Sequence, residues 1–224
     1  MCAIAGVVRR TRVSGSDVAR AEKMATVMRH RGPDDRGLRE GRNYAFAHRR
    51  LSIIDIEGGH QPMANESETV WLVFNGEIYN FKELRRELEG QGHHFRTRCD
   101  TEVIIHLYEE HGAGCVSKLN GMFAFALFDE DKKLLLMARD RAGIKPLYYS
   151  YDGNVFSFAS EAKALVQTSP RLVLPDSRSI VDYFALSLVQ EGRTAFKGIS
   201  QLKPAHCLVW SLDKQPREVR YWRF

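Results

Sequence analysis

Seven consecutive apolar residues, MFAFALF at positions 122–128, constrain the fold more than any other stretch of this sequence. A run of this length is typical of a buried strand, and successive side chains of a strand point to opposite faces. Both faces of this strand are therefore apolar and both need cover. Two sheets packed together with helices outside would supply it, so we predict an α+β fold with antiparallel sheets.

Turn signals around this run support antiparallel pairing. Segments 123–129 and 133–139 flank Glu130-Asp131-Lys132, and segments 147–151 and 155–159 flank Asp152-Gly153-Asn154, where Asp-Gly is a strong hairpin signal. Further strands are predicted over 3–9, 44–51, 70–74, 206–211 and 218–222. Helices are predicted from a Ser16 cap to Gly32-Pro33, from an Asn80/Glu83 capping box, and over 100–112, 161–166 and 179–188. No linker or composition break divides residues 1–224, so we expect a single domain.

Charge and hydropathy exclude several classes of protein. The net charge of +5 is spread along the chain, which favours a solvated surface over a nucleic-acid groove. No apolar stretch approaches the roughly 20 residues that a membrane-spanning helix needs, and the first residues do not resemble a signal peptide. We therefore expect a cytoplasmic protein that contacts neither membrane nor nucleic acid.

Metal and nucleotide motifs are missing from the sequence. The four cysteines (Cys2, Cys99, Cys115 and Cys207) are widely spaced and form no CxxC pair, and the eight histidines show no spacing such as HExxH. No Walker loop, GxGxxG or GxSxG occurs. We expect no disulfide framework, no metal site and no cofactor in this chain.

Cys2 is the first candidate for chemistry. Cysteine is often buried as a small apolar residue, which is the ordinary interpretation here. If Met1 is removed, however, Cys2 carries both a thiol and a free α-amine. The amine has a reference pKa near ~7.7–8.0 and the thiol near ~8.5, so the amine can accept the thiol proton close to neutral pH.

Three further stretches each allow a functional and a structural interpretation. Asn75-Gly76 could supply the N–H donors that stabilise a tetrahedral intermediate, or could form a simple turn after strand 70–74. Arg50 could bind a carboxylate with its guanidinium fork, or could be solvated or structurally paired. Asp100 could bind a substrate ammonium, or could cap a helix.

Nine short motifs in a fixed order carry a family resemblance. They are MCAIAGVV (1–8), MRHRGPDD (28–35), AHRRLSIID (47–55), QPM (61–63), FNGEIYNF (74–81), CDTEVI (99–104), LNGMFAFALFD (119–129), ARDRAGIKPLYY (138–149) and FASEAKAL (158–165). Together they resemble the glutaminase domain of the asparagine synthetase (glutamine-hydrolysing) family, a class II glutamine amidotransferase. RHRGPDD and NGEIYN favour this family over the glucosamine-phosphate and purine-pathway amidotransferases.

The resemblance implies a fold, a reaction and a set of site residues. The fold is the N-terminal-nucleophile hydrolase fold, a four-layer α-β-β-α sandwich, and the reaction is hydrolysis of the glutamine side-chain amide to glutamate and ammonia. Cys2 corresponds to the nucleophile, with its own α-amine as base, and Asn75 and Gly76 correspond to the oxyanion hole. The substrate-binding residues that it implies are Arg50 for the α-carboxylate, Asp100 for the α-ammonium, and Leu51, Ile53, Ile54 and Glu77 along the pocket wall.

Two departures from the family qualify these expectations. Ala3 stands where relatives usually carry glycine or serine, and its methyl group could crowd the pocket. Relatives also continue into an ATP-dependent synthetase domain, where ATP and magnesium are expected to bind, whereas this sequence stops at Phe224. The partners implied are glutamine, an attached or separate synthetase domain, and a second copy in a homodimer. The alternative hypothesis is a catalytically silent module that binds glutamine or docks a synthetase.

Overall fold

The computed structural model describes residues 1–52, 55, 58–169 and 173–223, and it contains two six-stranded sheets. All pairings between neighbouring strands are antiparallel. In spatial order, the first sheet consists of β10 (Ser200–Gln201), β8 (Tyr148–Tyr151), β9 (Val155–Ala159), β1 (Ala3–Arg9), β3 (Tyr44–Arg50) and β2 (Asp35–Glu40). The second consists of β12 (Arg217–Arg220), β11 (His206–Ser211), β7 (Leu134–Arg139), β6 (Gly121–Asp129), β5 (Val70–Ile78) and β4 (Met63–Ala64).

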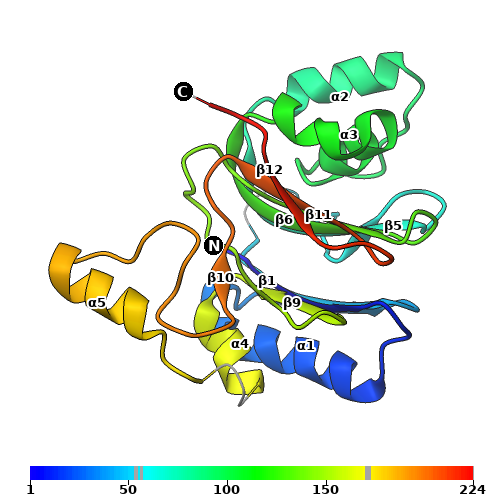
Figure 1. Ribbon diagram of the computed structural model, residues 1–224. Helices are drawn as coiled ribbons and strands as arrows, with labels where there is room; N and C mark the ends of the chain where they lie inside the picture. Colours follow the sequence, from blue (N-terminus) through cyan, green and yellow to red (C-terminus); the bar gives the residue numbers. More distant parts are fainter. Residues whose placement is uncertain (53–54, 56–57, 170–172, 224) are drawn as a thin grey trace.

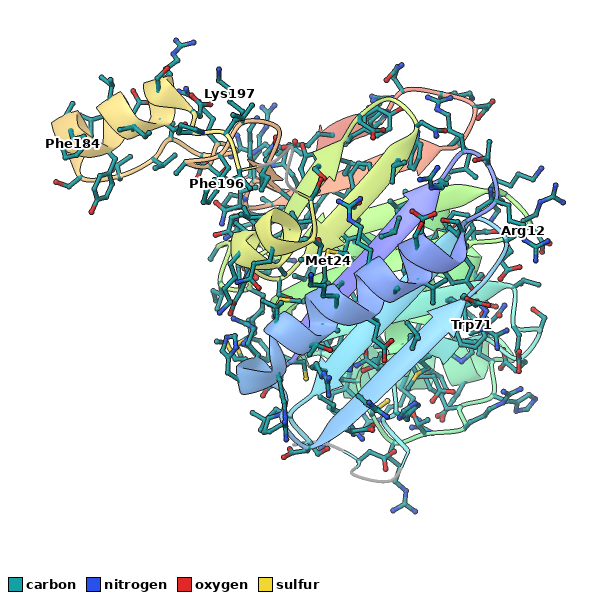
Figure 2. All side chains as sticks on the ribbon, turned by 90° about the horizontal axis from the view of Figure 1, so that it is seen from below. Arg12, Met24, Trp71, Phe184, Phe196 and Lys197 are labelled. Atoms are coloured by element: carbon teal, nitrogen blue, oxygen red, sulfur yellow. The ribbon has the colours of Figure 1, made fainter. Side chains whose placement is uncertain are left out.

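Helices cover the outer face of each sheet, which gives the predicted four layers (Figure 1). Helices α1 (Gly15–Val27) and α4 (Ala162–Thr168) cover the first sheet, and α2 (Phe81–Gly90) and α3 (Glu102–His111) cover the second. Helix α5 (Ser177–Leu186) projects from the body, and its Phe184 is 82% exposed (Figure 2). The short 3₁₀ segments are η1 (Arg29–Arg31) and η2 (Gly112–Lys118). No helix of the described residues is long and apolar enough to cross a membrane.

Residues 123–128 of the apolar run are buried on both faces, as the composition predicts, and Met122 at its start is partly exposed. In β6, Phe123, Phe125 and Leu127 pack against the layer of α2 and α3. Ala124, Ala126 and Phe128 pack between the two sheets, against residues of the first sheet such as Phe46 and Phe158. The alternation of small and large side chains lets the two sheets approach closely on one side of β6 and gives the helices a large apolar surface on the other.

Strand β1 follows the same rule and sets the position of Cys2. Ile4 and Val8 face the second sheet, whereas Ala3, Ala5 and Val7 face α1 and α4. This corrects one expectation, because the methyl group of Ala3 packs on the helix side of the sheet and Ala3 does not line the main pocket. Ala3 therefore gives no reason to expect a crowded site.

Several element ends differ from the predictions. Ser14 rather than Ser16 precedes α1, and the Asp17 carboxylate accepts hydrogen bonds from the Ser14 N–H at 2.8 Å and Oγ at 2.7 Å. Asn80 does not cap α2 with its side chain. Instead, its Oδ1 accepts a hydrogen bond from the Asn120 N–H and its Nδ2 donates to the Lys118 carbonyl. The predicted capping box is wrong because these longer-range contacts use the Asn80 amide.

Candidate active site

A cavity of about 300 Å³ opens where β1 begins, β3 ends and the second half of β5 lies. Antiparallel pairing places Ala3 opposite Arg49, so the start of β1 and the end of β3 meet at one end of their sheet. The cavity brings together every described residue of the predicted site: Cys2, Arg50, Leu51, Asn75, Gly76, Glu77 and Asp100. Ile53 and Ile54, which were also predicted to line it, lie outside the described residues.

Cys2 lies immediately before β1 with its sulfur against the backbone of Leu51. The Leu51 N–H donates to Sγ at 3.4 Å, and Sγ lies 3.7 Å from the Leu51 carbonyl oxygen. Burial raises the pKa of the Cys2 thiol, although the Leu51 N–H and the charges of the terminal ammonium, Arg50 and Arg31 oppose the shift. A thiol with a raised pKa stays protonated at neutral pH, so a nucleophilic role requires a nearby base.

Arg31 holds the start of the chain in place, a contact that the sequence did not reveal. Its Nε donates to the Cys2 carbonyl at 3.0 Å, and its Nη1 donates to Glu161 Oε1 at 3.2 Å. Glu161 also pairs with His30 and Lys163. Burial alone would raise the pKa of Glu161, but hydrogen bonds from Lys163, His30 and Arg31 lower it to about 2. Arg31 thus connects the residue before β1 to a charged carboxylate at the start of α4.

Asn75 and Gly76 lie inside a strand, which corrects both the predicted end at Phe74 and the turn interpretation. β5 continues to Ile78, and Asn75 and Gly76 pair with Ala124 and Phe123 of β6. The Asn75 side chain is 1% exposed, and its Nδ2 has no hydrogen-bond partner among the described residues. A buried amide donor without a partner is costly, so it requires an explanation.

Backbone N–H groups on the free edge of β5 follow a regular alternation. β4 pairs only as far as Leu72, and beyond it the Phe74 N–H donates to Gln61 Oε1 at 2.6 Å and the Ile78 N–H donates to Asp100 Oδ2 at 2.8 Å. Because every second residue of an antiparallel strand directs its N–H to the same edge, the Gly76 N–H between them points to this edge as well. Gly76 lines the cavity, and a Cβ on it would lie 2.2 Å from the Met122 carbonyl oxygen.

Two residues without a predicted role fix the backbone before Asn75. Gln61 binds the Phe74 N–H, and His48 Nε2 donates to the Phe74 carbonyl at 3.1 Å. Burial lowers the pKa of His48 to about 4, so this imidazole is neutral at physiological pH. The AHRR and QPM motifs that contain His48 and Gln61 were the only sequence signal for these contacts.

Arg50 is buried at the end of β3, which excludes the solvated interpretation. Its exposed fraction is 5%, and its Nη2 donates to the Asp55 carbonyl at 2.6 Å. Asp55 is itself tied to the segment before α3, because its carboxylate accepts hydrogen bonds from the Gly58 and Arg98 N–H groups at 3.0 and 2.7 Å. The guanidinium therefore lies on the cavity wall with a defined orientation.

Asp100 is a buried carboxylate rather than a helix cap. Thr101 occupies the cap position of α3, and Asp100 Oδ2 accepts the Ile78 N–H. Burial raises the pKa of Asp100 to about 6, and the charge of Glu77 contributes to the rise. A cationic group bound in the cavity would stabilise the ionised form of Asp100. The cavity thus carries a buried cation, Arg50, and a buried acid, Asp100, in addition to a thiol and an unpartnered amide donor.

Comparison with known proteins decides the family. A family profile described as "Glutamine amidotransferase domain" matches residues 1–222. The chain belongs to this family. Asparagine synthetase (glutamine-hydrolyzing) 3 of Bacillus subtilis is 40% identical to this amidotransferase domain over 233 residues, covering 100% of the chain and 36% of the relative. Asparagine synthetase (glutamine-hydrolyzing) 2 of Arabidopsis thaliana is 48% identical over 167 residues, covering 74% of the chain and 28% of the relative.

Solved structures support the fold of the amidotransferase domain. The glutamine phosphoribosylpyrophosphate amidotransferase of B. subtilis superposes with a TM-score of 0.69 at 18% identity, over 99% of this chain and 49% of that chain. A second structure, the allosteric regulatory enzyme of purine biosynthesis, gives a TM-score of 0.71 at 19% identity with the same coverage. The predicted resemblance and fold are therefore confirmed. The chain spans about a third of the length of the curated relatives that it matches.

Proposed function

We propose that this amidotransferase domain hydrolyses the side-chain amide of glutamine to glutamate and ammonia through a thioester on Cys2. The observation that carries the proposal is the unpartnered Asn75 Nδ2, which lines the same cavity as the Cys2 thiol. A carbonyl oxygen that becomes negatively charged during acyl transfer would accept hydrogen bonds from Asn75 Nδ2 and from the Gly76 N–H. The cost of leaving the amide unpaired in the free protein is then offset in the transition state.

The ends of the amino-acid substrate fit the charges of the cavity. Arg50 and Asp100 both line the cavity, where the guanidinium would bind an α-carboxylate and Asp100 an α-ammonium. Leu51 and Glu77 line the same cavity, and the Leu51 N–H contacts Cys2 Sγ. This arrangement favours an amino acid with a side-chain amide over a peptide, because both charged ends of the substrate are recognised.

The reaction requires a base that the unprocessed chain lacks. Met1 occupies the α-amine of Cys2 with a peptide bond, and Met1 lines the cavity. After Met1 is removed, the Cys2 amine accepts the thiol proton, and Sγ forms a bond to the amide carbon. The tetrahedral intermediate collapses with loss of ammonia, which takes its proton from the amine, and water then hydrolyses the thioester to glutamate and the free thiol.

We further propose that the ammonia serves an ATP-dependent amidation like that of the asparagine synthetase relatives. Their names describe glutamine-hydrolysing asparagine synthetases, and more than half of their length lies outside the match. ATP and magnesium would act in that other part, attached to this domain or on a separate chain. The alternative of a silent module loses its local support, because Ala3 faces the helices and not the cavity.

Glutamate release by the purified chain tests the proposal. Intact mass spectrometry first establishes the fraction of chains without Met1, and glutamate is then measured with excess glutamine. We expect release in proportion to the processed fraction and no release by Cys2→Ala. Cys115→Ala is the matched control. Cys115 is buried between the second sheet and the layer of α2 and α3, so this change should not affect turnover per folded chain. Release that survives in Cys2→Ala, or its absence in fully processed chains, would refute the proposed reaction.

A further inference from the structure

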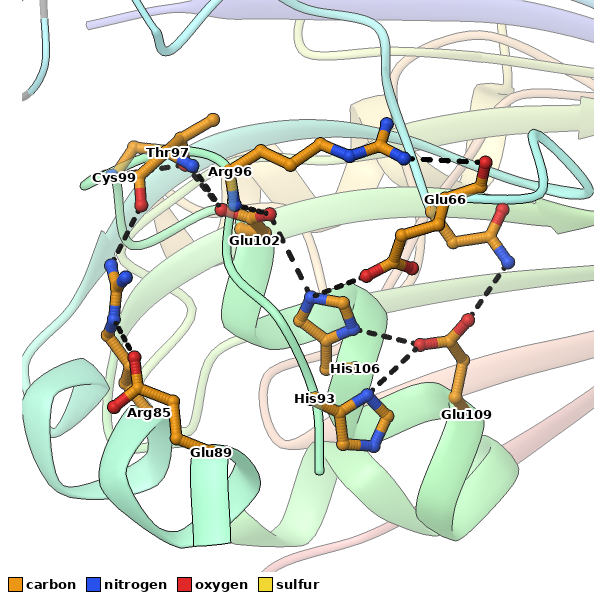
Figure 3. Close-up of polar contacts among 11 residues, drawn as sticks. Glu66, Arg85, Glu89, His93, Arg96, Thr97, Cys99, Glu102, His106 and Glu109 are labelled. Atoms are coloured by element: carbon orange, nitrogen blue, oxygen red, sulfur yellow. Dashed lines mark hydrogen bonds and ion pairs between the residues drawn. The ribbon is translucent and has the colours of Figure 1, made fainter. Parts of the chain in front are cut away.

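A cluster of imidazoles and carboxylates lies on the outer helical layer, apart from the amidotransferase cavity (Figure 3). His106 and Glu109 are three residues apart on α3, and His93 belongs to the segment between α2 and α3. Glu109 Oε2 lies 2.9 Å from His106 Nδ1 and 3.7 Å from His93 Nδ1. One ligand atom from each of the three residues lies within 4.8 Å of the others.

Carboxylates on the far side of both rings determine which nitrogen faces the centre of the cluster. His93 Nε2 lies 2.9 Å from Glu110 Oε1, so it carries a proton and donates it to that carboxylate. His106 Nε2 faces Glu102 at 3.8 Å and Glu66 at 3.9 Å, which likewise favours a proton there. A bound cation would replace the proton that His106 Nδ1 shares with Glu109 Oε2 at 2.9 Å, and both Nδ1 atoms would then act as electron-pair donors. A second carboxylate layer of this kind is the usual support of metal-binding histidines.

Glu109 is oriented in the same way. Asn65 Nδ2 donates to Glu109 Oε1 at 2.9 Å, which leaves Oε2 directed at the two imidazoles. Three acceptor atoms that converge on one point repel each other unless a cation or a proton lies between them. His106 is 1% exposed, whereas the His93 and Glu109 side chains are 15% and 26% exposed, so the three atoms converge where the interior of the helical layer meets its surface.

We propose that His93 Nδ1, His106 Nδ1 and Glu109 Oε2 bind a divalent transition-metal ion of the zinc class. Ligand bonds of about 2.0–2.2 Å in a tetrahedron place the ligand atoms about 3.3 Å apart. The two separations from Glu109 Oε2, 2.9 and 3.7 Å, lie on either side of this value. Two imidazoles and one carboxylate suit zinc better than magnesium or calcium, which prefer oxygen ligands. Water would occupy the fourth position, because His93 and Glu109 are partly exposed.

The position of the cluster gives the ion a structural role. The Glu102 carboxylate that faces His106 also accepts the N–H groups of Arg96 and Thr97, both at 2.8 Å. An ion that joins His93 to α3 would fix the start of segment 93–97, and Glu102 already holds its end. This segment leads to Asp100. The sequence did not predict this site, because His93 and His106 are 13 positions apart and the helix between Glu102 and His111 is what brings the ligands together.

Zinc binding by the folded chain tests this proposal without reference to catalysis. The measurement uses a Cys2→Ala parent, which removes the thiol of the cavity as a competing ligand, and titrates Zn²⁺ against a chromophoric chelator. We expect one equivalent per chain, and a loss of affinity of at least about 10-fold in His93→Gln and in Glu109→Gln. His94→Gln is the matched control, because His94 is the exposed neighbour of His93 and should bind as the parent does.

Cobalt as a second probe reports the ligand type. A Co²⁺ spectrum of tetrahedral nitrogen and oxygen ligation, lost in Glu109→Gln, would support the site. Glu109→Gln keeps the oxygen that accepts from Asn65, so folding should be preserved, and circular dichroism checks this. The proposal is overturned if the parent fails to bind Zn²⁺ at about 100 µM, which would mean that the cluster only shares a proton. It is also overturned if His93→Gln and Glu109→Gln bind Zn²⁺ as tightly as the control His94→Gln, or if the Co²⁺ spectrum shows sulfur ligation.

Discussion

Replacing Asp100 with asparagine should stabilise the free domain at neutral pH while it removes the proposed binding site for the substrate ammonium. Asp100 is 5% exposed, and burial is the main reason that its pKa rises from 3.8 to about 6. The folded chain therefore binds a proton at Asp100 more tightly than the unfolded chain does. Asparagine avoids the cost of ionisation and keeps one oxygen to accept the Ile78 N–H.

The pH dependence gives the size and the sign of the effect. Because the folded pKa is the higher one, Asp100 lowers the free energy of unfolding as pH rises from about 4 to about 6, and the full penalty is present above pH 6. A difference of about two pKa units corresponds to about 3 kcal/mol at pH 7.5 and about 1 kcal/mol at pH 4.5. The stability difference between Asp100→Asn and the parent should thus be about 2 kcal/mol larger at pH 7.5 than at pH 4.5.

Urea denaturation at the two pH values measures this difference. Comparing the two proteins at each pH cancels all other titrating groups, and Asp131→Asn, an exposed acid in the β6–β7 turn, should show no such change. Equal stability differences at the two pH values would refute the assignment of a raised pKa to Asp100. The same variant should also lose saturation by glutamine, and normal saturation would contradict the proposed contact with the substrate.

Three further variants separate catalysis, binding and folding. Asn75→Ala should lower kcat by about 10²–10³ without a comparable loss of stability, because it removes an amide donor that has no partner among the described residues. Unchanged turnover would show that Asn75 Nδ2 has no catalytic role. Arg50→Lys should raise the KM for glutamine by about 10–100-fold while kcat changes less, because a lysine cannot make the paired contacts of a guanidinium fork; a fall in kcat alone would contradict carboxylate binding. Gly37→Ala should destabilise the fold by about 1–3 kcal/mol or more, because a Cβ at this position would clash with the Gln61 carbonyl oxygen. Gly15→Ala is the control, because a Cβ there meets no atom within 4 Å, and urea midpoints measure both variants.

The strands with apolar residues on both faces could be predicted from the sequence almost to the residue. Predicted segments 3–9 and 155–159 match β1 and β9, because burial on two sides leaves few polar positions to interrupt the apolar pattern. Strand β2 was missed because its side chains are at most half-buried, so Asp35–Glu40 lacks an apolar signal. Helix α1 begins earlier than predicted because Ser14 and Asp17 bind each other across its first turn.

The site itself could be predicted only through the order of its motifs. Cys2, Arg50, Asn75 and Asp100 are far apart in the sequence, and each had an ordinary structural interpretation of its own. Strand pairing brings them together, and pairing partners cannot be derived from local composition. Gln61 and His48 show the remaining gap, because their role depends on where β4 ends beside β5, which is a property of the assembled sheet.

The end of β4 also explains why Asn-Gly must stay within a strand here. If β4 continued beside β5, its carbonyls would accept the N–H groups of Phe74, Gly76 and Ile78 in turn. Gln61 and Asp100 instead accept the first and third of these, and the Gly76 N–H between them points towards the cavity. Successive side chains of β5 point to opposite faces of the sheet, with Trp71 and Val73 between the two sheets. Asn75 follows the same alternation and faces the space between the sheets, where Cys2 also lies. A turn at Asn75-Gly76 would break this alternation. The two residues can therefore act as the proposed donor pair only because the strand runs on to Ile78, whose N–H is bound by Asp100.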